Sequence, residues 1–243
     1  MNLRIATWNM AYPFYKSYHK DAWDYLLNEI DADIILFQEA RPTAYLNEDD
    51  KHLVWNEIGD NRSWGSGIYS QKYELKEETI KSDFKGVFSI ANTTIGVIDL
   101  TLISIYGLIE NNGPNKGFAI TNLHRILSDL TGLFCGRING KRNIILGGDL
   151  NASLQIDQKQ KGESHKIFFE RLEDFGLKDA FKKLNKPYPL QTLRHSKSKV
   201  KWQNDYFFLS EQISNRIVDC AVIENESIRR YSDHNPVVMT IEL

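Results

Sequence analysis

The sequence has 243 residues, of which 42% are apolar and 26% are charged, with fifteen glycines and six prolines. These values exclude a collagen-like or glycine- and proline-rich disordered chain, and the length suits one α/β domain over residues 1–243. The net charge of −2 excludes a protein that holds nucleic acid by bulk basicity alone, while a local basic groove is compatible with it.

The first forty residues predict a strand, a helix and a second strand. Residues 3–8 form a short apolar run that is typical of a buried strand. Helical spacing of apolar residues follows over 23–30, and residues 33–37 predict another buried strand. This order is typical of an α/β unit.

The middle of the chain is richer in strands. Strands are predicted at 67–70, 86–91, 94–99 and 101–106. Asn92 and Thr93 suit the turn of a hairpin between the second and third of these. Helical spacing returns over 117–134, and a buried strand at 143–146 runs into Gly147-Gly148-Asp149.

The last third predicts one helix and three strands. The helix covers 165–175, with Gly176 as its C-cap, and the strands lie near 202–209, 216–223 and 236–242. The polar segments 155–165 and 186–201 are predicted as loops. About nine or ten strands with three clear helices exceed simple β/α alternation. The predicted class is α/β, with two packed mixed β-sheets flanked by helices in a four-layer sandwich.

Polar side chains repeatedly stand where an apolar strand stops or starts. They are Asn9, Gln38-Glu39, Asp149, Asn151, Asp205, Asp233 and His234. Strand ends on one side of a sheet converge, so these groups could meet in one cleft. Asp149 and Asn151 are two apart, so they would face the same way on an extended chain. Asp233 and His234 are adjacent, so one could hold a metal while the other faces a substrate.

Asp205 needs a partner, because it stands beside four apolar residues and an unpaired buried carboxylate is costly. A histidine is the natural partner, since the pair fixes the ring and favours its charged form. Taken singly, each position also has a plain structural interpretation. Asn9 could be a cap, Glu39 a solvated loop acid and Asp233 an Asx-turn.

The five motifs together resemble the endonuclease/exonuclease/phosphatase superfamily over residues 4–238. They are Trp8-Asn9, Gln38-Glu39, Gly148-Asp149-Leu150-Asn151, Asn204-Asp205-Tyr206 and Ser232-Asp233-His234-Asn235-Pro236. Each motif is weak alone, and their order and spacing make the resemblance strong. It implies a metal-dependent phosphoesterase on a two-sheet α/β sandwich.

The resemblance also implies roles for the residues in these motifs. Glu39 and Asp233 would bind Mg²⁺ or Mn²⁺, hard cations that prefer oxygen ligands. Asn9 would hold Glu39 or touch phosphate, and Asn151 would donate a hydrogen bond to phosphate or water. Two assignments stay open for the remaining groups. In one, Asp149 orients or deprotonates the attacking water while His234, charged by Asp205, stabilises the phosphate; in the other, His234 is the general base.

Three features resemble the AP endonuclease-like branch in particular. Tyr106 ends its predicted strand where that branch has tyrosine, and Trp202 precedes Asp205 by three, where that branch lines its nucleotide pocket. The third feature is the stretch 176–181. Differences stand at Met10-Ala11, Gly107-Leu108, Leu193 and Gln203, so AP-site specificity is not implied.

The predicted substrate is DNA, and RNA is the alternative nucleic acid. Segment 186–201 is basic and leads into the Asp205 strand, so Arg194 and Lys199 are candidate phosphate contacts, and Arg41 is another. The alternative is a phosphoesterase for an inositol phosphate, a nucleotide or sphingomyelin. A catalytically dead binding module is the third possibility, and the intact acid–histidine set argues against it.

Localisation and assembly follow from what the sequence lacks. No apolar run approaches the roughly 18 residues of a membrane helix, and no signal-peptide pattern stands at the N-terminus. Two cysteines cannot build a disulfide scaffold. We therefore expect a cytoplasmic protein without membrane partners, and a monomer by default.

Overall fold

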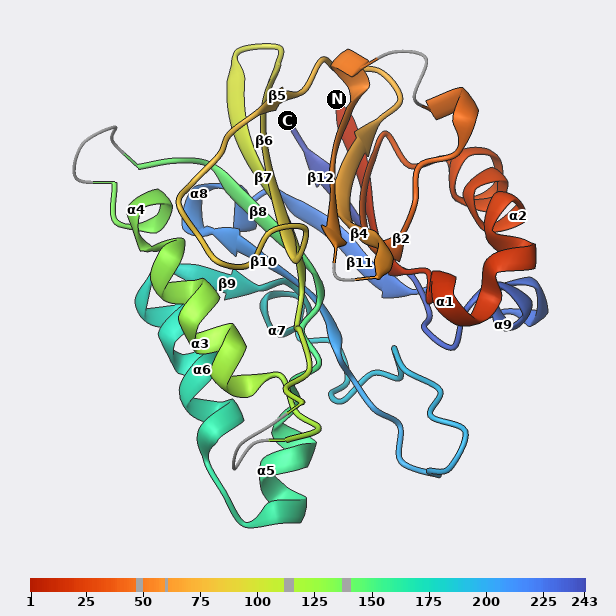
Figure 1. Cartoon of the computed structure of the whole chain (residues 1–243). Coiled ribbons are helices and arrows are strands. Elements are labelled where there is room, and N and C mark those ends of the chain that lie inside the picture. The colour runs from red at the N-terminus through yellow and green to blue at the C-terminus, as the bar shows by residue number, and fades with distance from the viewer. Residues whose placement is uncertain (47–49, 60, 112–115, 137–140) are drawn as a thin grey trace.

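The computed structural model describes residues 1–46, 50–59, 61–111, 116–136 and 141–243. Within these residues the strands form two six-stranded sheets that lie face to face (Figure 1). The first sheet consists of β1 (Asn2–Asn9), β2 (Ile34–Ala40), β3 (Leu53–Gly59), β4 (Arg62–Ser70), β11 (Ile217–Val222) and β12 (Val237–Glu242). Its order is β11-β12-β1-β2-β4-β3, with β1 and β2 parallel and the other neighbours antiparallel.

The second sheet repeats this mixed arrangement. It consists of β5 (Lys76–Glu77), β6 (Phe88–Ile95), β7 (Ile98–Tyr106), β8 (Ile144–Asp149), β9 (Leu177–Asp179) and β10 (Asp205–Ser210). Its order is β5-β6-β7-β8-β10-β9, and here the parallel pair is β7 and β8. The parallel pairs matter for the site, because parallel strands end at the same edge of a sheet.

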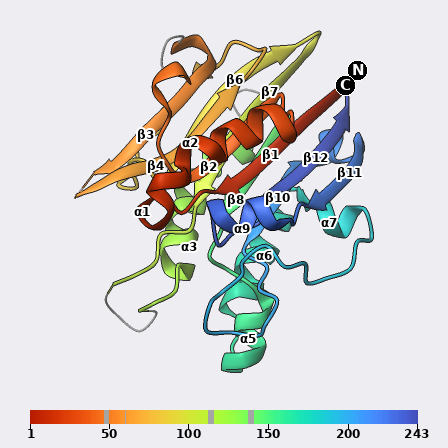
Figure 2. The same ribbon diagram turned by 90° about the vertical axis from the view of Figure 1, so that its right-hand side faces the viewer.

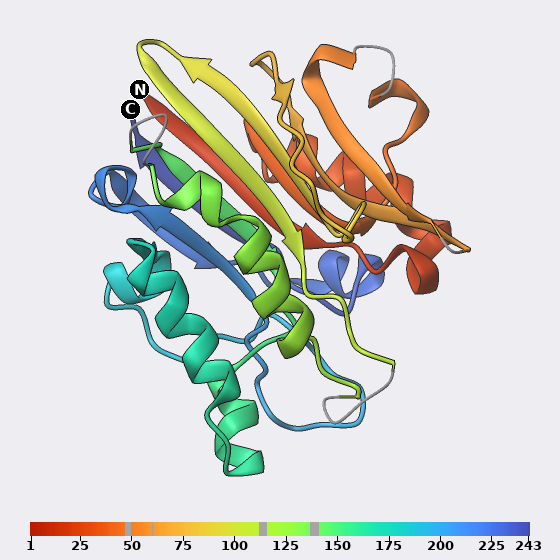
Figure 3. The same cartoon turned by 60° about the vertical axis from the view of Figure 1, so that its left-hand side comes forward.

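Helices surround both sheets: some cover the outer faces, and others contribute side chains to the core between the sheets. They are α1 (Tyr12–Tyr15), α2 (His19–Asp24), α3 (Ile120–Asp129), α4 (Thr131–Phe134), α5 (Leu154–Gln160), α6 (Ser164–Asp174), α7 (Ala180–Lys183), α8 (Glu211–Ser214) and α9 (Glu226–Tyr231). Short 3₁₀ turns occupy Lys16–Tyr18, Ala44–Leu46 and Asp50–His52, and a π-helical turn, Tyr25–Glu29, extends α2. Figure 2 shows α2 against the first sheet, and Figure 3 shows α3 and α6 against the second.

Three apolar clusters fill the spaces between these layers. One lies between the sheets and includes Leu36 and Phe207, both fully buried. A second joins Trp8 to Trp23 of α2, and a third joins Ile103 to Phe168 of α6. Strands that alternate between two buried faces explain why β1, β2 and β8 are continuous apolar runs in the sequence. The predicted four-layer α/β sandwich is therefore confirmed.

Two local predictions are wrong. Asn92 and Thr93 do not turn a hairpin, because β6 continues through both of them and Ile95 pairs with Ile98. The turn is made by Gly96, whose φ of +62° is easily adopted by glycine. The predicted strand 94–99 is consequently the tip of this hairpin.

Segment 155–165 is also not a loop. Ser153 caps α5 by accepting a hydrogen bond from the Gln155 backbone N–H, and Asp157 then accepts from the backbone of His165 and Lys166. Capping and a carboxylate at the start of α6 thus offset the polar composition that suggested a loop. No helix in the described part of the chain is long and apolar enough to span a bilayer.

Candidate active site

Both sheets place polar side chains at one shared edge. Asn9 ends β1, Tyr106 ends β7 and Asp149 ends β8, while Glu39 is next to last in β2. β10 and β12 run antiparallel to these strands, so Asp205 and the turn before Val237 reach the same edge from the other direction. Asp205 lies opposite Asp149, and so does Tyr106 on the other neighbouring strand. The strand topology alone therefore gathers the groups that the motifs singled out.

Asn9 joins the two sheets at this edge. Its Nδ2 donates to Glu39 Oε1 at 3.0 Å and to Asp149 Oδ2 at 2.8 Å. Its Oδ1 accepts from the backbone N–H of Ala11 at 2.9 Å, which fixes the orientation of the amide. One buried amide thus holds two carboxylates that would otherwise repel each other.

His234 lies between two buried aspartates. Its Nδ1 is 2.9 Å from Asp205 Oδ2, and its Nε2 is 3.8 Å from Asp149 Oδ2. Burial by itself lowers the pKa of His234, but the charges of Asp205 and Asp149 raise it to about 10. The imidazole is therefore protonated near neutral pH.

Asp149 is fully buried, and its two oxygens accept from Asn151. The Asn151 backbone N–H donates to Oδ1 at 2.8 Å and its Nδ2 to Oδ2 at 3.1 Å. The sequence placed Asp149 and Asn151 on one side of an extended chain. This prediction is wrong, because β8 ends at Asp149 and Asn151 has a φ of +44°. Burial raises the pKa of Asp149 to about 7, although the positive charge of His234 opposes this rise.

Glu39 and Tyr106 face each other across the sandwich. Burial raises the pKa of Glu39, and its hydrogen bonds to Asn9 and Tyr106 counteract that rise. Burial and the neighbouring charges of Glu39 and Asp149 raise the pKa of Tyr106, so its hydroxyl keeps its proton. Trp64, which the sequence gave no reason to select, packs edge-on against Tyr106 at 5.6 Å.

Asp233 and His234 are adjacent in the sequence, but their side chains have different neighbours. His234 turns toward Asp205. Burial raises the pKa of Tyr15 and that of Glu39, and the negative charge of Asp233 adds to both shifts. The Asp233 carbonyl accepts from the backbone N–H of Arg194 at 2.8 Å. Asp233 and Glu39 are therefore near enough for their charges to act on each other.

The donor set fits a hard divalent cation. Asp149, Asp205 and His234 have ligand atoms within 4.8 Å of one another, so they form a buried group that could hold a metal. His234 is already hydrogen-bonded to Asp205 and protonated, and a protonated ring is a poor ligand. Glu39 and Asp233 offer carboxylate oxygens without that conflict, which agrees with the ligand preference of Mg²⁺ and Mn²⁺.

A strap made of residues 190–194 binds the two halves of the site together. Thr192 Oγ1 accepts from the backbone N–H groups of Asn204 and Asp205 at 2.9 and 3.0 Å. The guanidinium of Arg194 donates to the carbonyls of Ser232 and His234. Arg194 was selected as a substrate contact, and here it braces the turn that carries His234.

The remaining substrate candidates lie in three different places. Trp202 lines a hollow of about 460 Å³ with Asn151 and Asn204, and Lys159 Nζ lies 6.0 Å from the centre of its ring. Arg41 lies over the ring of Tyr12 at 6.0 Å, beside the end of β2. Lys199 is exposed within the 186–201 loop and does not line this hollow.

Sequence reasoning missed several supporting residues. Ser232 Oγ donates to the Asn9 carbonyl at 2.8 Å and accepts from the His234 backbone N–H at 3.0 Å. Asn204 Nδ2 donates to Asn151 Oδ1 at 3.3 Å. Both residues stand inside the quoted motifs, so their position beside Asp205 and Asp233 was an available signal. Trp64 had none, because β4 carries glycines and no clear alternation at that point.

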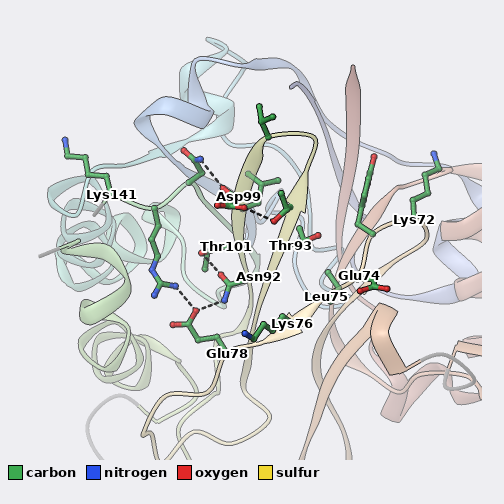
Figure 4. A pocket seen from close by; sticks show the side chains of 16 residues that line it. Lys72, Glu74, Leu75, Lys76, Glu78, Asn92, Thr93, Asp99, Thr101 and Lys141 are labelled. Carbon is green, nitrogen blue, oxygen red and sulfur yellow. Dashed lines mark hydrogen bonds and ion pairs between the residues drawn. The ribbon is translucent and has the colours of Figure 1, made fainter. Parts of the chain in front are cut away.

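A second, wider hollow lies at the opposite end of the strands. It has a volume of about 1100 Å³ around the hairpin of β6 and β7 (Figure 4). Its charged groups are largely paired, since Arg142 contacts Glu78 at 2.6 Å and Asn92 donates to Glu78 at 2.6 Å. No acid–histidine group of the described residues lines it, and the group formed by Asp149, Asp205 and His234 lies at the other edge.

Comparisons with known proteins agree with this geometry. The model of the family described as Endonuclease/Exonuclease/phosphatase family matches residues 6–234. A curated DNA-(apurinic or apyrimidinic site) endonuclease from Plasmodium berghei (strain Anka) is 26% identical over 228 residues, which cover 70% of this chain and 41% of that protein. The chain thus spans well under half the length of that relative.

Solved structures show the same fold. An AP endonuclease from Archaeoglobus fulgidus superposes with a TM-score of 0.73 at 19% identity, covering 99% of this chain and 100% of its own. The AP endonuclease LMAP from Leishmania major gives a TM-score of 0.77 at 15% identity, covering 100% of this chain and 88% of its own. The endonuclease domain of the retrotransposon TRAS1 gives 0.70 at 18% identity, covering 100% and 99%.

Proposed function

Because the chain belongs to the endonuclease/exonuclease/phosphatase family, we propose that it is a divalent-metal-dependent phosphodiesterase that hydrolyses DNA. The observation that carries the proposal is the junction at Asn9, which joins Glu39 to Asp149 beside the His234–Asp205 pair. The AP endonucleases among the similar proteins support DNA as the substrate and the AP endonuclease-like branch.

Each residue has a task in the hydrolysis. Asp149 accepts a proton from the attacking water as the new P–O bond forms and the bond to the leaving oxygen breaks, and its pKa of about 7 suits a base near neutral pH. Asn151 orients that water or donates to the phosphate. Protonated His234 donates to a phosphate oxygen, where negative charge increases in the transition state.

A divalent cation would be held by Glu39 and Asp233, and it supplies positive charge against the phosphate oxygens. Asn9 keeps Glu39 in place for this, through the hydrogen bond of 3.0 Å. The raised pKa of His234 favours Asp149 over His234 as the general base. Tyr106, bonded to Glu39, positions that carboxylate from the other side.

The test compares site variants with a distant acid. Asp149→Asn, Glu39→Gln and His234→Ala should each lower the rate of DNA cleavage by about 10² or more, because each removes a group that acts on the transition state. Glu78→Gln, at the opposite end of the strands, is the control and should cleave at the wild-type rate. A near wild-type rate in any of the three site variants, with the protein properly folded, would contradict the assignment.

The substrates should include plasmid, linear duplex, abasic duplex and single-stranded DNA, with Mg²⁺ or Mn²⁺ and with EDTA as the metal-free control. Removal of the metal should abolish cleavage. A phosphomonoester such as p-nitrophenyl phosphate is the discriminating substrate. If it is hydrolysed faster than every nucleic acid, the enzyme is a phosphatase and the nuclease proposal is wrong.

A further inference from the structure

The segment directly after β1 is unusually aromatic for an exposed surface. Residues 12–18, here called the aromatic segment, comprise α1 and the 3₁₀ turn after it, and carry Tyr12, Phe14, Tyr15 and Tyr18. Phe14 is 82% exposed and Tyr18 is 46% exposed. Phe14 in particular loses little contact with water on folding, so the fold itself gains little from it.

The aromatic segment borders the catalytic edge. Ala11 leads into it and is bonded to the Asn9 side chain at 2.9 Å. Tyr15 lies close enough to Asp233 and Arg194 for both charges to act on it. Figures 1 and 2 show α1 at the end of β1, on the side of the first sheet, whereas the Trp202 hollow belongs to the side of the second.

The segment is held in place from beneath. The ring of His19 packs edge-on against Tyr12 at 4.7 Å, and His19 Nε2 contacts the Arg41 carbonyl at 2.7 Å. Trp23 Nε1 donates to the same carbonyl at 2.9 Å. Lys16 Nζ and the Arg41 guanidinium lie 5.9 and 6.0 Å from the centre of the Tyr12 ring. The Tyr12 ring is therefore ordered before any ligand arrives and has cations beside it. The backbone N–H groups of Phe14 and Tyr15 donate to the Ala11 carbonyl at 2.9 and 3.1 Å, which holds the turn that carries them.

We propose that the aromatic segment stacks unpaired bases of the DNA strand that passes through the active site. The inference rests on the proposed function and narrows its substrate to DNA that is single-stranded or locally unpaired beside the cleaved phosphate. Rings with neighbouring cations bind base faces and backbone together, whereas phosphate contacts alone would need only the cations. The bases of an intact duplex are already stacked on one another and offer no free face to Phe14.

Binding of fluorescein-labelled DNA of about 16 nucleotides in EDTA tests the proposal without cleavage. Three ligands are compared: the single strand, its duplex, and a backbone of the same length in which tetrahydrofuran replaces every nucleoside. Phe14→Ala should weaken single-strand affinity by about tenfold, and the other two affinities by less than about twofold. Phe14→Tyr should restore single-strand affinity, because it keeps the ring.

Val97→Ala is the matched control, since Val97 is 98% exposed at the far hairpin and should change none of the three affinities. Unchanged single-strand affinity in Phe14→Ala, or an equal loss on all three ligands, would overturn the proposal. The two proposals fail in different ways. If the wild type cleaves DNA but Phe14→Ala binds normally, only the stacking is wrong; if the wild type neither cleaves nor binds DNA, both are wrong.

Discussion

Thr192 shows how one neutral hydroxyl can hold charged groups in place without contacting their charged atoms. It is fully buried, and its Oγ1 accepts two backbone N–H groups at the start of β10, where Asp205 begins. Asp205 in turn fixes the ring of His234. The position of the His234 imidazole therefore depends on a neutral side chain in the strap of residues 190–194.

Thr192→Val keeps the shape of the side chain and removes the acceptor. It should lower the free energy of unfolding by about 2–4 kcal/mol, because two buried N–H groups lose their partner. Urea unfolding measures the change. Thr192→Ser, which keeps the hydroxyl, is the control, and an equal loss in both variants would show that the hydroxyl contributes nothing.

The sequence context identifies some residues of the candidate site and gives no role to others. Asn9, Glu39 and Asp149 could be selected because each follows an apolar run that ends abruptly, and the strand topology then brings them together. Thr192 and Ser232 could not be given a task in the same way. Their partners are backbone groups of Asp205 and Asn9, which come close only after both sheets have packed.

At the scale of elements, β8 must pass close to both of its neighbours in the sandwich. A Cβ atom on Gly147 would lie 2.7 Å from a ring carbon of Phe207 and 2.8 Å from Leu36 Cδ1. Leu36 belongs to β2 in the first sheet and Phe207 to β10 in the second. The glycine therefore sets how closely the two sheets approach beneath the site.

Gly147→Ala should destabilise the fold by about 1–3 kcal/mol, since the added methyl group overpacks this interface. Gly132→Ala in α4 is the comparison, because a Cβ there meets no atom within 4 Å. It should stabilise by about 0.5–1 kcal/mol through the better helix propensity of alanine. Thermal unfolding of both variants checks the pair, and a stable Gly147→Ala would contradict the tight approach.

The elements that were predictable are the ones buried on both faces. β1, β2, β8, β10 and β12 are apolar runs, and their hydrophobicity is visible without any partner. β3 was not predicted, because it is partly exposed. The hairpin of β6 and β7 turns at Gly96 rather than at Asn92, because asparagine and threonine fit a strand when neighbouring strands pair with them. α5 depends on the Ser153 cap, a contact that outweighs its polar composition.

Across the whole molecule, an ion pair joins two distant segments at the end opposite the site. Arg142 and Glu78 are 64 residues apart and contact each other at 2.6 Å in the hollow of Figure 4. The hydrogen bond from Arg142 lowers the pKa of Glu78 below its ordinary value.

We also propose that residues 1–243 form one domain, since the cluster between the sheets draws on strands from both ends of the chain.

This pair predicts how stability responds to acid. A lowered folded-state pKa contributes stability above the unfolded-state value of 4.5, and that contribution is lost as the pH falls through the folded-state pKa. Glu78→Gln should therefore melt below the wild type at neutral pH, and the gap should shrink below about pH 4. Glu74→Gln, at an exposed carboxylate, is the control. A gap that is constant from neutral to acid pH would contradict the assignment.

The hydrogen bonds at the edge that carries the candidate site span the two sheets. Asn9 of the first sheet meets Asp149 of the second at 2.8 Å, and His234, which precedes β12, meets Asp205 of β10 at 2.9 Å. N–H···O hydrogen bonds have donor–acceptor distances of about 2.7–3.2 Å and depend on a near-linear geometry, so a small slide of one sheet over the other disturbs both contacts together. The proposed activity therefore depends on how the buried side chains between the two sheets align. Substitutions of Leu36, Phe207 or Gly147 would disturb the candidate site as well as the core.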